Sequence, residues 1–147
     1  MKRLFLLAVV ALATVTTSAQ WLDVPAYHSG SPKKTDQLPP ILSGAQLTGR
    51  SFRHPFQVHG YKLAARIPSV IYQLPCYCYC DRGMLAHTSL RSCFESDHAA
   101  SCAACLKEVF YAYQMHKRGK KTADIRQGII RGEWEKIELR SAATSIN

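Results

Sequence analysis

Residues 76–105, CYCYCDRGMLAHTSLRSCFESDHAASCAAC, contain all six cysteines of the 147-residue chain and two of its six histidines. The stretch opens with a C-x-C-x-C run and closes with a C-x-x-C pair, and Cys93 lies between them. Small domains often need disulfides or a metal ion to supplement a modest apolar core. We therefore expect this stretch to determine both the fold and the chemistry of the protein.

The two ends of this stretch are predicted to present their side chains differently. If residues 76–80 are extended, the three sulfurs point to one face, because alternate residues of an extended chain share a face. Residues from about 97 to 118 have an apolar period of three and four residues, which predicts a helix. On that helix His98, Cys102 and Cys105 would form one stripe.

The flanking sequence is also predicted to be helical. Residues 60–74 have helical periodicity, and Pro68 interrupts them, so we expect two short helices or one kinked helix. A further helix is expected from Thr122 to about Trp134, after a helix end at Gly119. The predicted fold class is mainly α: a small cysteine-rich helical domain over residues 60–135, with an irregular loop that carries the cysteines.

The N-terminal residues 1–19 have the pattern of a Sec-type signal peptide. Two basic residues precede ten apolar ones, and a small-residue cleavage site follows. No lipobox cysteine follows, so we expect a periplasmic or secreted protein. Residues 20–59 hold five of the seven prolines and are predicted to be a Pro-rich tail or linker, and residues 136–147 a C-terminal tail.

The formal net charge of +9 favours acidic partners or an anionic membrane surface in general terms. Export argues against a nucleic-acid partner, and the sequence identifies no protein partner. It contains no recognisable catalytic triad, phosphate-binding loop or outstanding pair of carboxylates. We expect a binding protein rather than an enzyme, and a thiol oxidoreductase if it is an enzyme.

Three interpretations of the cysteine cluster compete, and a metal site is the first of them. Thiolates combined with imidazoles suit Zn(II) or Cu(I). The candidate ligands are Cys76, Cys78, Cys80, His87, Cys93, His98, Cys102 and Cys105.

The other two interpretations are redox chemistry and structural disulfides. Cys102 and Cys105 lie near a predicted helix N-terminus, where the helix dipole favours a thiolate. No βαβ pattern surrounds them, so a thioredoxin fold is not indicated. Three structural disulfides in an exported domain agree with the even cysteine count, but bridges within residues 76–80 would be strained.

Three linked motifs also resemble a known family. Residues 74–80 (LPCYCYC), 87–94 (HTSLRSCF) and 98–105 (HAASCAAC) are similar to the bacterial CYCXC family of exported (seleno)proteins and to PCYCGC-motif lipoproteins. The resemblance implies that the six cysteines, His87 and His98 define the family, but it assigns no role to them. Tyr79 stands where the lipoproteins have glycine, and Ala86 precedes His87 where glycine is expected.

Overall fold

A computed structural model describes residues 23–145, and within that range every regular element is a helix. The predicted mainly α fold class is therefore confirmed. The predicted signal peptide, residues 1–19, lies outside the described residues. The α-helices are α1 (Pro55–Arg66), α2 (Pro68–Ile71), α3 (Ala103–Lys117), α4 (Thr122–Ile130) and α5 (Leu139–Ser145). The 3₁₀ helices are η1 (Gly44–Gln46), η2 (Cys80–Arg82), η3 (Leu90–Phe94), η4 (His98–Ser101) and η5 (Glu133–Lys136).

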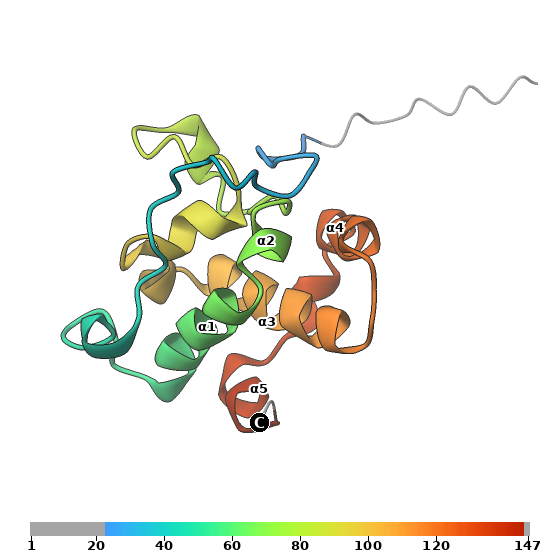
Figure 1. Cartoon of the computed structure of the whole chain (residues 1–147). Helices are drawn as coiled ribbons and strands as arrows, with labels where there is room; N and C mark the ends of the chain where they lie inside the picture. Colours follow the sequence, from blue (N-terminus) through green and yellow to red (C-terminus); the bar gives the residue numbers. More distant parts are fainter. Residues whose placement is uncertain (1–22, 146–147) are drawn as a thin grey trace, which may run out of the picture.

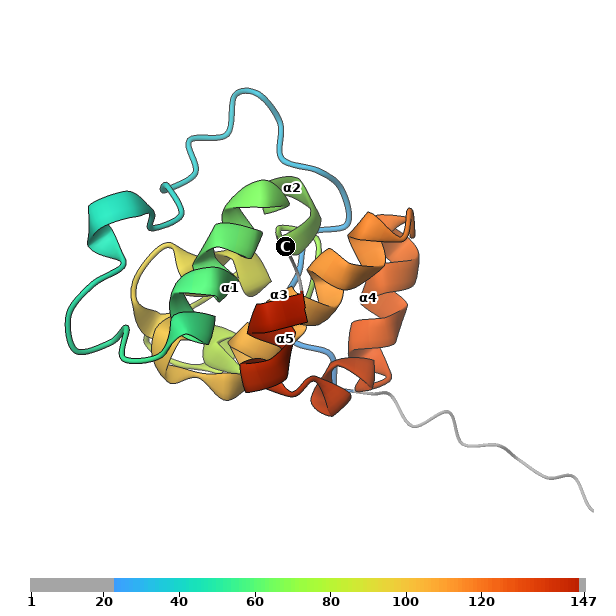
Figure 2. The same ribbon diagram turned by 90° about the horizontal axis from the view of Figure 1, so that it is seen from below.

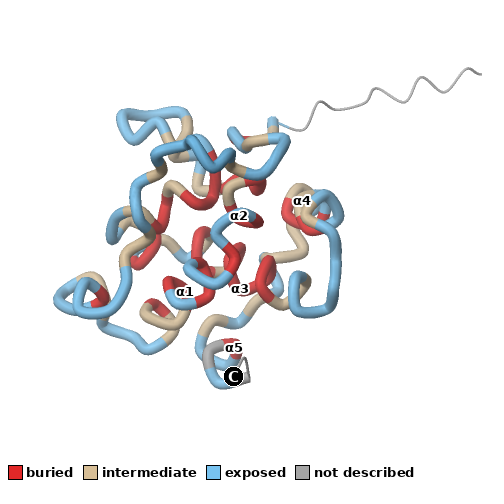
Figure 3. Tube along the Cα trace, viewed as in Figure 1, coloured by how far each residue is buried: buried red, intermediate tan, exposed pale blue. Residues whose placement is uncertain are grey.

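Helix α3 is the centre of the molecule, and α1, α4 and α5 pack around it (Figures 1 and 2). Its buried face includes Leu106, Val109 and Phe110, as the predicted stripe requires. Figure 3 shows that the buried parts of the chain concentrate where α1, α2 and α3 meet. Helices α1 and α3 approach closely at Gly60, where an added Cβ would lie 2.7 Å from Leu106 Cδ2.

The break at Pro68 is confirmed. Ile67 has φ −130° and ψ 44°, which separates α1 from α2, and Pro68 is the first residue of the second helix. Helix α1 itself begins at Pro55, before the predicted start of the helical region. Proline suits the first helical turn because its missing N–H would have no intrahelical partner there.

The helix predicted over residues 97–118 is shorter than expected at its N-terminus. A 3₁₀ helix, η4, occupies residues 98–101, and α3 begins only after Cys102. The single helical stripe of His98, Cys102 and Cys105 is therefore wrong, because the change of helix type rotates His98 away from the α3 register. The predicted helix end is confirmed: Gly119 has φ +75°, and Lys120 N–H donates to the Met115 carbonyl.

Helix α4 ends at Ile130, short of the predicted Trp134. Gly132, with φ +73°, separates it from η5. Residues 139–145, which the sequence places in the C-terminal tail, form α5 and pack against α1 and α3.

The irregular segment of residues 23–54 lies against the helices and the cysteine loop. The His28 ring stacks on Tyr72 with centroids 3.8 Å apart. The Leu42 N–H donates to the Phe94 carbonyl over 3.0 Å, and Leu47 is buried. No helix within the described range is both long enough and apolar enough to span a bilayer.

Candidate metal centre

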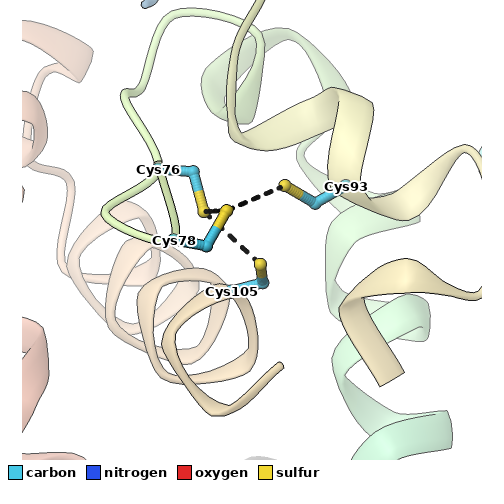
Figure 4. A group of neighbouring side chains, drawn as sticks. All are labelled: Cys76, Cys78, Cys93 and Cys105. Atoms are coloured by element: carbon cyan, nitrogen blue, oxygen red, sulfur yellow. Dashed lines mark hydrogen bonds between the residues drawn. The ribbon is translucent and has the colours of Figure 1, made fainter. Parts of the chain in front are cut away.

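Four cysteine sulfurs meet at the N-terminal turn of α3. Cys76 and Cys78 come from the loop after α2, Cys93 from η3 and Cys105 from α3 (Figure 4). All four Sγ atoms lie within 4.8 Å of one another. The Cys76 Sγ is 3.2 Å from that of Cys78 and 3.4 Å from that of Cys105, and the Cys78 and Cys93 sulfurs are 4.0 Å apart.

This four-sulfur group is largely buried, and no disulfide joins its members. Cys93 and Cys105 have no exposed surface, Cys76 is 5% exposed and Cys78 is half-buried. All six cysteines are free thiols, so the structure gives the three-disulfide interpretation no support. Metal–sulfur bonds of about 2.3 Å in a tetrahedron place the sulfurs about 3.8 Å apart. The observed separations are close to that value.

The run of residues 76–80 is a turn and not an extended strand. The Tyr79 N–H donates to the Cys76 carbonyl over 3.2 Å, and Tyr79 has φ +55°. The predicted single face of three sulfurs is therefore wrong. The turn keeps Cys76 and Cys78 in the four-sulfur group and brings Cys80 to His98, where Sγ and Nε2 are 3.1 Å apart.

Two further ligand groups adjoin the four sulfurs. Cys78, Cys80 and His98 form one, and His87, Cys93 and His98 form the other. His87 Nδ1 is 3.3 Å from Cys93 Sγ, and the two imidazole rings are perpendicular with centroids 5.1 Å apart. Burial, and then the charge of His98, lower the pKa of His87. The neutral imidazole that results is the form that binds metals.

Cys102 is the one predicted ligand outside these three groups. It precedes the first residue of α3 and is half-buried. Hydrogen bonding with Cys102, and then with Cys105, lowers the pKa of the Cys78 thiol to about 2. These hydrogen bonds favour the thiolate of Cys78, which is the form of cysteine that binds metals.

Burial acts in the opposite direction on Cys80. Burial, and then the neighbouring Cys78, raise the pKa of the Cys80 thiol to about 12. A bound cation would reverse this effect, since coordination to a metal deprotonates a thiol. Cys78 thus favours the ionised form, whereas Cys80 must release a proton when it binds a metal ion.

Glu108 adjoins the cluster and was missed by the sequence analysis. It is fully buried, and its Oε1 accepts a 2.7 Å hydrogen bond from the Tyr77 N–H. Its Oε2 has no hydrogen-bond partner in the described part of the chain. Burial, and then the charge of Cys76, raise the pKa of this carboxyl well above its ordinary value. An acidic residue three positions after Cys105, on the apolar face of a helix, was the available signal.

One protein family matches the part of the chain that contains this cluster. Residues 33–135 match a family described as a protein of unknown function with a PCYCGC motif. The chain belongs to this family. Its copy of the motif is residues 75–80, PCYCYC. No curated protein and no solved structure matches the chain.

The two departures from the expected sequence pattern have a common structural setting. Tyr79 has φ +55° and Ala86 has φ +44°, and among the described residues only these two non-glycine positions have positive φ. Glycine adopts this left-handed conformation readily, whereas a Cβ disfavours it. The family's glycine at the position of Tyr79 therefore suits the backbone that the turn requires.

Proposed function

We propose that this chain is a small exported protein that binds a soft or borderline metal ion, Zn or Cu, through its Cys/His cluster. The observation that carries the proposal is the four-sulfur group: Cys76, Cys78, Cys93 and Cys105, all within 4.8 Å and all free. Thiolates and imidazoles are the preferred ligands of these metals. Export rests on the predicted signal peptide in residues 1–19.

Electrostatics supports a cation at this position. A partly buried thiolate needs a compensating charge or several hydrogen bonds, because its hydration has been removed. The groups that act on Cys76 and Cys78 are mainly other thiols that hydrogen-bond with them, together with the Glu108 carboxyl at Cys76. A metal ion would neutralise these sulfurs and stabilise their close approach.

A small cavity lies against the sulfurs. Its volume is about 10 Å³, and its lining includes Cys76, Cys78, Cys80 and His87. That volume is roughly enough for one water molecule or ion and too small for an organic substrate. The space beside the sulfurs therefore favours an ion as the ligand.

Redox chemistry is the second candidate, and one observation favours it. Cys102 is half-buried at the start of α3, three residues before Cys105, and hydrogen bonding with Cys102 raises the pKa of the Cys105 thiol. A thiol–disulfide protein would cycle between the reduced pair and a Cys102–Cys105 disulfide. The complete burial of Cys105 limits its access to a partner thiol.

The test uses residues 20–147, exported in a bacterial host and purified untagged under argon. We expect one or more equivalents of Zn or Cu by elemental analysis, and thiols that react only after denaturation. The Cys105→Ser variant should bind less metal than the wild type, whereas His116→Gln, which changes an exposed histidine on the same helix, should bind the same amount.

Fully reduced protein that takes up neither Zn(II) nor Cu(I) under argon would overturn the proposal. If the same sample held no metal and formed a Cys102–Cys105 disulfide in a glutathione buffer, the redox function would replace it.

A further inference from the structure

The three ligand groups overlap. Cys78 belongs both to the four-sulfur group and to the group with Cys80 and His98. Cys93 belongs both to the four-sulfur group and to the group with His87 and His98. The two shared sulfurs therefore lie between two sets of ligands.

The number of ligands exceeds what one ion can use. Zn(II) in protein sites takes four ligands, and the three groups together contain seven different side chains. Cys76 and Cys105 form one pair outside the shared sulfurs, with Sγ atoms 3.4 Å apart. Cys80 and His98 form a second pair, with Sγ and Nε2 3.1 Å apart.

We infer that the centre holds two metal ions that share the thiolates of Cys78 and Cys93. This inference rests on the proposed metal-binding function. Cys76 and Cys105 are the terminal ligands of the first ion, and Cys80 and His98 are those of the second. The two shared and two terminal ligands complete four coordination positions around each ion. The imidazole of His87 lies against the shared Cys93 sulfur, as a hydrogen-bond donor or an additional ligand.

The two shared sulfurs are close enough to bind the same ion. Two sulfurs bound to one ion at about 2.3 Å stand about 3.8 Å apart when the angle at the metal is tetrahedral, and two ions that share both sulfurs draw them closer together, because the charged ions need more separation than that span leaves. Cys78 Sγ and Cys93 Sγ are 4.0 Å apart. Each of these sulfurs also lies within 4.8 Å of a ring nitrogen of His98.

The charge balance also favours a second ion. Four thiolates around a single divalent ion leave two net negative charges in a largely buried site, and burial of unpaired charge is unfavourable. A second divalent ion recruits the thiolate of Cys80 and leaves one net negative charge on the pair of ions with their five thiolates. Each thiol that binds releases its proton to solvent, and no electron transfer is required.

The test is a titration of reduced, metal-free protein (residues 20–147) with Co(II), and separately with Zn(II), under argon. Native mass spectrometry should show a species with two ions per chain. In the electron paramagnetic resonance spectrum, the second equivalent of Co(II) should reduce the signal per ion, because shared thiolates couple the two spins. Saturation at one ion, or two ions with additive signals, would overturn the shared-ligand centre and leave the proposed metal binding intact. Failure to bind any Co(II) or Zn(II) would overturn both.

Variants separate the two ions. Cys80→Ser and His98→Gln each remove a terminal ligand of the second ion, so the stoichiometry should fall from two ions to one. His116→Gln is the matched control, because His116 is an exposed histidine of α3 that lies in none of the three ligand groups, and it should still bind two. Circular dichroism establishes that each variant is folded. Two ions in folded Cys80→Ser and His98→Gln would assign the second ion to other residues and overturn the inference.

Discussion

At the scale of single residues, the backbone of the cysteine loop is held in conformations that its side chains disfavour. The left-handed region is disfavoured for a residue with a Cβ by roughly 1–2 kcal/mol. Tyr79 offsets part of this through its ring, which lies 4.2 Å from the Arg82 guanidinium carbon and contacts the Tyr77 ring edge-on. Ala86 is exposed and has no comparable side-chain contact to gain. The strain at Ala86 is therefore the easier of the two to relieve.

We expect Ala86→Gly to stabilise the protein by about 0.5–1 kcal/mol, since the relief of left-handed strain exceeds the extra entropy of glycine in the unfolded chain. Urea unfolding of the metal-free, reduced protein measures this. The control is Ala45→Gly at an exposed alanine without positive φ, where the same substitution should be neutral or destabilising. Equal destabilisation by both changes would contradict the prediction.

The candidate ligand residues could be predicted from the sequence more readily than their grouping. The spacing of the cysteines and histidines identified every member of the three ligand groups. It could not show that the turn at Tyr79 separates Cys80 from Cys76, because that turn depends on contacts with distant residues. One such contact is the 2.7 Å hydrogen bond from the Tyr77 N–H to Glu108 Oε1. Glu108 was missed because burial of a carboxyl depends on what packs over it.

At the scale of elements, α4 lies against α3 through a glycine. A Cβ at Gly128 would lie 1.9 Å from Tyr111 Oη and 2.9 Å from Glu133 Oε2. These two groups form a hydrogen bond in which the Tyr111 hydroxyl donates to the Glu133 carboxylate over 2.5 Å. This hydrogen bond joins α3 to η5 next to the buried Gly128 of α4.

Gly128→Ala should destabilise the protein by about 1–3 kcal/mol, because overpacking outweighs the gain in helix propensity of roughly 1 kcal/mol. Thermal and urea unfolding measure the change. Gln127→Ala, at an exposed neighbouring position of α4, should alter stability little. A Gly128→Ala variant more stable than the wild type would contradict this prediction, because Tyr111 would then move aside without loss of stability.

The hydrogen bond between Tyr111 and Glu133 predicts that the stability of the protein depends on pH. Hydrogen bonding from Tyr111, and then from Arg131, lowers the pKa of Glu133 below its ordinary value of 4.5. The stabilisation is therefore fully present above about pH 4.5 and is lost as the pH falls through the lower folded-state pKa. Glu133→Gln should lose less stability than the wild type on acidification.

Melting temperatures of metal-free protein between about pH 6 and pH 3 measure this difference. Glu138→Gln is the control, because Glu138 is an exposed carboxylate whose side chain has no hydrogen bond or ion pair recorded in the structure. Parallel curves for wild type and Glu133→Gln would contradict the role of the Tyr111–Glu133 contact.

Element boundaries show where local signals suffice. Pro68 and Gly119 act through their own backbone restrictions, so the break after α1 and the end of α3 were predicted correctly. Helix α5 contains alanine and small polar residues with weak periodicity, and its buried Ala142 gains a partner only when α1 and α3 are in place. The 3₁₀ form of η4 likewise depends on contacts such as the 2.7 Å hydrogen bond from Gln57 to the Ala100 carbonyl.

At the scale of the whole molecule, the apolar core and the cysteine cluster are adjacent but made from different residues. Tyr61, Leu63 and Phe110 are fully buried between helices and contribute no ligand. The candidate ligands come from the loop after α2, from η3 and η4, and from the first turns of α3. Helix α3 joins the two parts, since Cys105 and Phe110 lie on the same buried face.

This division predicts that metal removal loosens one part of the molecule and leaves the other folded. In a metal-loaded sample, a chelator with reductant should raise hydrogen exchange across residues 76–98, where backbone order depends on the ligands. Exchange in α1 and in the second half of α3 should change little, because apolar burial stabilises those helices without the metal. The measurement is peptide-resolved hydrogen exchange followed by mass spectrometry.

Cys105→Ser provides the matched comparison. Before any chelator is added, its residues 76–98 should already exchange faster than those of the metal-loaded wild type, and the chelator should raise their exchange by less than it does in the wild type. Equal loss of protection in α1 and in residues 76–98 would contradict the division, because it would make metal binding and folding of the whole chain inseparable. Unchanged protection of residues 76–98 would show that the loop is ordered by its backbone contacts alone. The two parts of the fold are thus distinguished by which of them needs the metal to remain ordered.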